Sequence, residues 1–102
     1  MKREDVLKKA INLINGERAS DYGNAYDNHN RIAQLWSVVL GIKVTAQTVA
    51  LCLILVKVAR LITSPNKLDS WIDIGGYTAL GGEFVEKEKD IYKKEINKRD
   101  QN

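Results

Sequence analysis

The sequence has little of several features that mark particular classes of protein. Its single cysteine, Cys52, excludes an internal disulfide, and its position in the apolar segment VALCLILV indicates a small buried side chain rather than a reactive thiol. The N-terminal segment MKREDVLKKA has no apolar core of the kind that a signal peptide needs. The longest apolar run ends at Lys57 and is expected to be too short to span a bilayer. We therefore predict a cytoplasmic protein.

Charge of one sign is also scarce. The 16 basic and 13 acidic residues leave a net charge of only +3, and the basic residues of the C-terminal tail alternate with acids. With no basic helix face and no recognised motif, nucleic acid is not expected as a partner. A single domain of 102 residues buries only a modest core. Association with copies of itself, as a homo-oligomer, is therefore expected.

Helical periodicity runs through the whole sequence, because apolar residues recur at three- and four-residue steps. The predicted fold is all-α: a compact four-helix bundle with a long, central, buried third helix, which is apolar on nearly all faces. The predicted helices cover about residues 4–15, 25–40, 45–63 and 68 to at least 84. Residues 1–87 form the predicted all-α domain, and residues 88–102 a charged helical extension or a frayed tail.

Capping residues define the expected helix ends. Asn24 and Thr45 are good N-caps for the second and third helices. Gly16 and Gly41 are expected to end the first and second helices. The Ser64-Pro65-Asn66 segment breaks the chain after the third helix and turns the fourth back antiparallel to it.

The segment SWIDIGGYTALGGEF is unusual for a helix, because its four glycines cost about 1 kcal/mol each against alanine. Gly75, Ala79 and Gly82 share a stripe with Leu68 and Ile72. Small residues on such a stripe predict the close approach of another helix, within the chain or between subunits. Two alternatives are a floor against which a flat ligand lies, and a helix that is broken here.

Two cations interrupt the third helix, and two carboxylates follow on the fourth. Lys57 and Arg60 share one face, as do Asp69 and Asp73. Counting outward from the break at Pro65, we expect Lys57 to lie opposite Asp73 and Arg60 opposite Asp69. A buried cation needs such a partner. The pairs form either a structural ladder of ion pairs or the lining of a pocket for phosphate or carboxylate.

The segment SDYGNAYDNHNR gathers polar and aromatic groups at the start of the second helix. Asn28 and His29 lie one turn before the apolar residue Ile32, so both are expected to face inward and to meet the charged ladder. The segment predicts a polar pocket, with an internally satisfied network as the alternative. Trp36 is expected in the core, whereas other aromatic residues, Tyr77 among them, could stack on a base.

Three segments, ERASDYGNAYDNHNRIAQLW, VALCLILVKVARL and LDSWIDIGGYTALGGE, resemble a family of uncharacterised small phage and prophage proteins. Its pattern is D/E-R-x-x-D-Y-G, then N-H/F, then K-x-A-R, then D-S-W/F-x-D-x-x-G-Y. The resemblance covers residues 1 to about 87. It marks the family and assigns no function.

The chain is more distantly similar to a phage nucleotide-modification-associated domain, which implies nucleotides as ligands. The matching positions are Arg18, Asp21, Tyr22, Gly23, Asn28, Lys57, Arg60, Asp69, Asp73 and Tyr77. A third likeness is to the MazG-like all-α pyrophosphohydrolases, which bind Mg²⁺ with E-x-x-E and E-x-x-D. The sequence lacks that pair of motifs, and the carboxylates of the fourth helix have cations as their best neighbours.

These observations favour a phage-type nucleotide-binding protein that sequesters a nucleotide-derived signal of host defence, without catalytic residues, metal or cofactor. The predicted ligand-binding residues are Arg18, Asp21, Tyr22, Asn28, His29, Lys57, Arg60, Asp69, Asp73 and Tyr77. The first alternative is a metal-dependent hydrolase, in which His29 or Asp21 is the base and Asp69 with Asp73 holds Mg²⁺. The second alternative is a protein-interaction module that uses the glycine-lined helix. Whether the protein is an enzyme stays open at this point.

Overall fold

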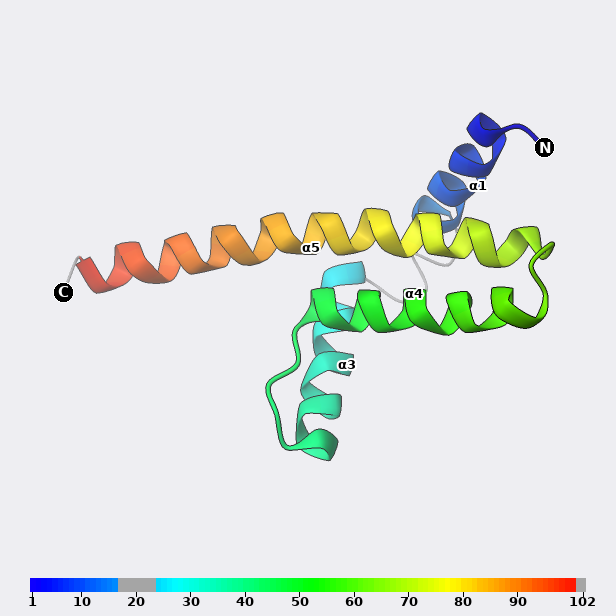
Figure 1. The fold of residues 1–102 in the computed structure, drawn as a ribbon. Helices are drawn as coiled ribbons and strands as arrows, with labels where there is room; N and C mark the ends of the chain where they lie inside the picture. Colours follow the sequence, from blue (N-terminus) through cyan, green and yellow to red (C-terminus); the bar gives the residue numbers. More distant parts are fainter. Residues whose placement is uncertain (17–23, 101–102) are drawn as a thin grey trace.

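The computed structural model describes residues 1–16 and 24–100, and these residues form four α-helices and no strand (Figure 1). The helices are α1 (Arg3–Asn15), α3 (Ala25–Leu40), α4 (Ala46–Thr63) and α5 (Leu68–Asp100). The predicted all-α, four-helix architecture is confirmed. The segment after residue 87 continues α5 without a break.

The helix ends follow the capping residues. The Asn24 side chain accepts a hydrogen bond from the backbone N–H of Tyr26 at 2.9 Å, and α3 begins there. Gly41 ends α3 in the left-handed conformation, with φ at 69°, which glycine adopts without strain. Thr45 caps α4 by accepting from the backbone N–H of Thr48 at 3.3 Å. These local signals explain why the helix boundaries were readable from the sequence.

Two of the helices form an antiparallel hairpin that carries the others. In Figure 1, α4 runs back along α5, α1 packs against α5 away from α4, and α3 extends from the hairpin beyond α4. The connection from α3 to α4 is tied by the Ser37 hydroxyl, which donates to the Ala33 carbonyl and accepts from the Val44 N–H.

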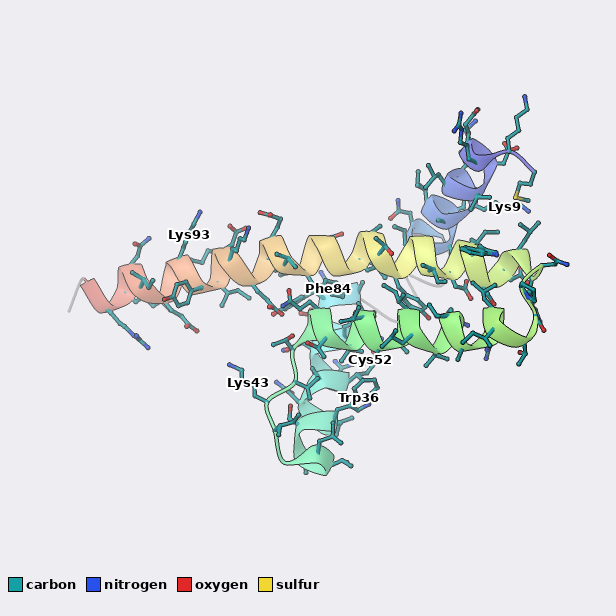
Figure 2. All side chains as sticks on the ribbon, in the orientation of Figure 1. Lys9, Trp36, Lys43, Cys52, Phe84 and Lys93 are labelled. Atoms are coloured by element: carbon teal, nitrogen blue, oxygen red, sulfur yellow. The ribbon has the colours of Figure 1, made fainter. Side chains whose placement is uncertain are left out.

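The buried core is small and consists mainly of small residues. Ala46 and Ala50 of α4 pack against Phe84 of α5, and Tyr26 and Leu80 cover this cluster. Figure 2 shows Phe84 between the ribbons of α4 and α5. Alanines let the two helices approach closely, but each buries little apolar area. Trp36, expected in the core, is only half-buried.

The apolar helix α4 is mostly exposed in a single chain, contrary to the expectation of burial. Only 17% of its residues are buried, and Leu51, Leu55 and Ile62 are 56%, 57% and 79% exposed. The reason is that α5 covers one side of α4, while α1 packs on α5 instead. By length and composition alone α4 is also long and apolar enough to cross a membrane, although its uninterrupted apolar run ends at Lys57.

The molecule is long for its size. Its radius of gyration is 16.1 Å, whereas a compact domain of this length has about 13 Å. The C-terminal part of α5 projects beyond the other helices, as Figure 1 shows. The principal-axis extents of the whole molecule are 56 × 30 × 23 Å. The chain therefore combines a four-helix architecture with much uncovered surface.

Two of the glycines in α5 allow α1 to approach. A Cβ at Gly75 would lie 3.3 Å from the Cβ of Ala10, and one at Gly76 would lie 3.2 Å from Ile14 Cγ2. The interpretation of close helix packing is confirmed at these two positions, and α5 is not broken there. A Cβ at Gly82, in contrast, would meet no atom within 4 Å.

Candidate functional site

A salt bridge joins the two helices of the hairpin at its middle. The Nζ atom of Lys57 lies 3.1 Å from a carboxylate oxygen of Asp73, and the side chains are 16% and 25% exposed. The pairing predicted from the hairpin geometry is confirmed for these two residues. At this degree of burial water screens the pair only in part, so the two charges hold each other in place.

The second predicted pair does not form. Among the described residues, Arg60 makes no salt bridge with Asp69, and its side chain is exposed. Asp69 instead lines a hollow between α5 and α1. The prediction failed because α1, whose position no local pattern indicates, lies on the side of α5 to which Asp69 belongs.

This hollow, the α1–α5 hollow, gathers polar groups of both signs. Its volume is about 590 Å³, within the range of small-molecule sites. It is lined by Lys9, Asn12, Leu13, Asp69, Ile72 and Asp73. Because Asp73 also binds Lys57, a second ammonium group lies at its edge.

Local helix geometry places these side chains together. Lys9 and Asn12 are three residues apart on α1, and Asp69 and Asp73 are four apart on α5, so each pair shares a face. Gly76 lies within one turn of Asp73 and lets α1 come close. Sequence reasoning missed Lys9 and Asn12. Their three-residue spacing beside the apolar face of α1 was the signal that could have suggested them.

His29 occupies a separate cluster at the start of α3. It is only 7% exposed, and its Nδ1 donates to the Ala25 carbonyl at 2.8 Å. The ring lies 4.9 Å from that of Phe84, which in turn meets Tyr26 edge-on at 5.6 Å. The Nε2 atom is buried and has no hydrogen-bond partner among the described residues. The inward orientation predicted for His29 is confirmed.

The expected meeting of His29 with the charged ladder is wrong within one chain. Its neighbour Phe84 follows Asp73 by eleven residues on α5, which is about 16 Å along a helix axis. Asn28 is half-buried on the same turn of α3 as His29. Three other predicted ligand residues, Arg18, Asp21 and Tyr22, lie outside the described residues.

Tyr77 lines a different depression, the α4–α5 groove, of about 310 Å³. The groove is lined by Gln47, Thr48, Ala50, Leu51, Ile54, Tyr77, Thr78, Gly81, Gly82 and Val85. At the floor of the groove the two helices are close together, because a Cβ at Gly81 would lie 3.6 Å from that of Ala50. The seven predicted ligand residues that the structure describes therefore do not converge on one pocket in a single chain.

The environment of Tyr26 changes the acidity of its phenol. Burial, followed by the carboxylates of Glu88 and Asp27, raises the pKa of Tyr26 above its ordinary value. The ammonium group of Lys87 lies 5.0 Å from the ring centroid, in a cation–π contact. The neutral phenol is thus the stable form at physiological pH.

The residues that the structure describes contain no group of three or more His, Cys, Asp or Glu side chains placed to hold a metal ion. Asp69 and Asp73, which the hydrolase alternative assigns to Mg²⁺, share their hollow with Lys9. Hard cations need several converging oxygen ligands and are repelled by nearby ammonium groups.

Comparison with known proteins places this site in a family context. Residues 5–85 match the family model described as "Domain of unknown function (DUF6378)". The chain is 42% identical to the Gene 55 protein of Mycobacterium phage L5 over 76 residues, which are 74% of this chain and 49% of that protein. It is 38% identical to the Gene 55 protein of Mycobacterium phage D29 over 74 residues, 72% of this chain and 49% of that protein. The chain spans about half the length of these curated relatives, and no solved structure matches it.

Proposed function

The chain belongs to the DUF6378 family, and from that premise we propose that it is a phage-type binding protein for a nucleotide or nucleotide-derived small molecule. In this proposal the ligand occupies the α1–α5 hollow and leaves it unchanged. The protein would act in the cytoplasm of an infected cell by withholding a nucleotide signal of host defence. The similar relatives are proteins of phages, which supports the setting but names no ligand.

The observation that carries the proposal is the charge arrangement at the hollow. Lys9 and Lys57 approach it from two helices, and Asp69 and Asp73 line it from a third. Lysine is a point charge suited to phosphate. A carboxylate accepts hydrogen bonds from ribose hydroxyls. A nucleotide presents both kinds of group, whereas a simple anion offers no hydroxyl to the carboxylates.

The remaining lining residues suit a base. Asn12 offers a donor and an acceptor on one side chain, as the edge of a base requires. Leu13 and Ile72 supply apolar surface against which a flat ring can lie. Arg18, Asp21 and Tyr22 follow α1 in the sequence and stay predicted ligand residues. Arg60, Asn28, His29 and Tyr77 do not line this hollow.

The carboxylates of the hollow favour binding of a nucleotide over its hydrolysis. One of the two carboxylates in the hollow, Asp73, is already neutralised by Lys57 at 3.1 Å. That leaves Asp69 as the one lining carboxylate among the described residues without such a partner at hand. A single carboxylate beside Lys9 is a poor ligand set for Mg²⁺.

Isothermal titration with ATP, ADP, AMP and cyclic dinucleotides tests the proposal. Lys9→Met should weaken binding of the preferred nucleotide, because it removes a charge-assisted contact worth about 1.5–3 kcal/mol, or roughly 10- to 150-fold in Kd. Lys8→Met is the matched control: Lys8 precedes Lys9 on α1 but does not line the hollow, so its Kd should match the wild type.

Two results would replace the proposal. If no member of the panel binds, or if Lys8→Met and Lys9→Met weaken binding equally, the hollow is not a nucleotide site. If a nucleoside triphosphate is hydrolysed with Mg²⁺, and Asp69→Asn abolishes turnover while the helical circular dichroism is retained, the hydrolase alternative holds instead.

A further inference from the structure

The exposed side of α4 carries a regular seam. Apolar residues recur at alternating steps of three and four, the spacing of the a and d positions of a coiled coil. The seam consists of Thr48, Leu51, Leu55, Val58 and Ile62. Its four apolar members are between 39% and 79% exposed. A seam of this kind buries its side chains when a second helix packs along it.

α5 continues this surface on the same side of the hairpin. Trp71, Thr78 and Val85 are seven residues apart and so share a face of α5. Two of them, Thr78 and Val85, line the α4–α5 groove together with Leu51 of the seam. Trp71 is 51% exposed and Val85 is 37% exposed. The seam and this α5 stripe form one surface, the α4–α5 face.

We propose that the α4–α5 face is an interface with a second copy of this chain, related by a two-fold axis. The two α4 helices would lie antiparallel, with the axis near Leu55 at the centre of the seam. Leu51 would then lie opposite Val58 of the other copy, and Thr48 opposite Ile62. This inference is independent of the proposed nucleotide site, which lies between α5 and α1.

The chain exposes more surface than a compact monomer of its mass, which supports an interface with a second copy. The chain exposes 7838 Å², whereas a compact monomer of 11.5 kDa exposes about 5,800 Å². The projecting end of α5 contributes part of the excess of about 2,000 Å². A stable interface needs about 800 Å² from each partner. The total excess is larger than this value.

The shape of the face is self-complementary. The α4–α5 groove lies beside the seam: Thr48 and Leu51 of the seam line it, and Ala50 and Gly81 meet at its floor. At Gly82 the backbone is open to the surface, because a Cβ there would meet nothing within 4 Å. Because Thr48 and Leu51 line the groove, this two-fold axis brings Ile62 and Val58 of each copy to the groove of the other, as an isologous contact requires.

Charge also favours a copy of this chain over a lipid surface. α4 has two charged residues, Lys57, which is turned to Asp73 on α5, and Arg60; neither belongs to the seam. No like charges therefore meet when the seam is placed against itself. A bilayer would instead surround the whole hairpin, including the Lys57–Asp73 pair and Asp69, which is costly in hydrocarbon.

Sedimentation equilibrium of the full chain tests the proposal. The wild type should sediment at twice the chain mass of 11.5 kDa. Leu55→Glu should sediment at the single-chain mass and keep its helical circular dichroism, because it places a charge opposite itself at the axis. Val39→Glu is the matched control, since Val39 is 84% exposed on α3 and outside the face, so the dimer should persist.

If Leu55→Glu fails to fold, two single-cysteine variants test the interface instead. In a Cys52→Ala background, Leu55→Cys should form a disulfide-linked dimer on mild oxidation, whereas Val39→Cys should not. A wild type that is monomeric at every concentration would overturn the proposal. So would cross-linking through Val39→Cys alone, or a protein recovered only on phosphatidylcholine vesicles.

Discussion

Lys57 is one of two charges on the most apolar helix of the chain, and its position there is tolerable because α5 supplies Asp73 at 3.1 Å. The same pair forms one edge of the proposed nucleotide site. A substitution of Lys57 is therefore expected to change two quantities, the free energy of unfolding and the affinity for the ligand, and the two must be measured separately. Stability is therefore the first property to measure at this position.

Lys57→Met should destabilise the fold by about 2 kcal/mol. Removing one partner of a fully buried pair costs about 3–5 kcal/mol, and the partial exposure of this pair reduces that value. Urea unfolding at fixed protein concentration measures it. The control is Lys89→Met, whose exposed pair with Glu86 should contribute less than about 0.5 kcal/mol. Equal effects of the two substitutions would mean that the Lys57–Asp73 pair has no structural role.

Tyr26 predicts a dependence of stability on alkaline pH. Its pKa is raised in the folded chain, chiefly by burial, so its phenol ionises less readily there than in the unfolded chain. The stability that it contributes is then fully present below the unfolded pKa of about 10 and is lost as the pH rises through the folded pKa. Thermal unfolding followed from about pH 9 to about pH 11 should show a smaller decline for Tyr26→Phe than for the wild type. Identical declines would contradict this account.

At the scale of the helices, the glycines of α5 have different roles on its different sides. Gly75 and Gly76 face α1, and a methyl group at Gly76 would press on the side chains of Leu13 and Ile14. Gly82 faces open space within the chain. The close approach of α1 at the first two positions is what forms the α1–α5 hollow.

In the Leu55→Glu background, where no second copy covers the groove, Gly82→Ala should therefore stabilise the protein by up to about 1 kcal/mol through helix propensity alone. Gly76→Ala should gain less or lose stability, because its methyl group would lie 3.2 Å from Ile14 Cγ2. Circular dichroism melts of the two variants at equal concentration give the comparison. A larger gain for Gly76→Ala than for Gly82→Ala would show that α1 does not pack as described.

The elements and their ends could be predicted from the sequence, because a cap such as Asn24 or Thr45 acts on its own helix within one turn. The Lys57–Asp73 pair was also predictable, since the short break fixes the register of the hairpin. The position of α1 was not, because it depends on contacts between residues such as Ala10 and Gly75 that are distant in sequence. Hence Asp69 was assigned the wrong partner, and Lys9 and Asn12 were missed.

At the scale of the molecule, the small core and the large exposed surface both indicate that a single chain buries little apolar area. Phe84 and Val49 are the largest fully buried side chains among the described residues, while the seam of α4 stays uncovered in one chain. A chain with so little internal burial should depend on its partner copy for stability. Its melting temperature is then expected to rise with protein concentration, because mass action favours the folded dimer.

Differential scanning fluorimetry over a hundredfold range of concentration, about 1–100 µM, checks this dependence. Leu55→Glu is the comparison, since a variant unable to form the interface should melt at a temperature independent of concentration. A wild type with a concentration-independent melting temperature would contradict the dependence on a partner copy.

The central claim is that the α1–α5 hollow binds a nucleotide, and native mass spectrometry tests it most directly. The purified wild type is sprayed with and without a library of nucleotides and cyclic dinucleotides, beside Lys8→Met and Lys9→Met. The account predicts one nucleotide per chain on the wild type and on Lys8→Met, with occupancy lost in Lys9→Met. A spectrum in which the wild type carries no nucleotide from the library, or in which Lys9→Met retains full occupancy, would contradict it.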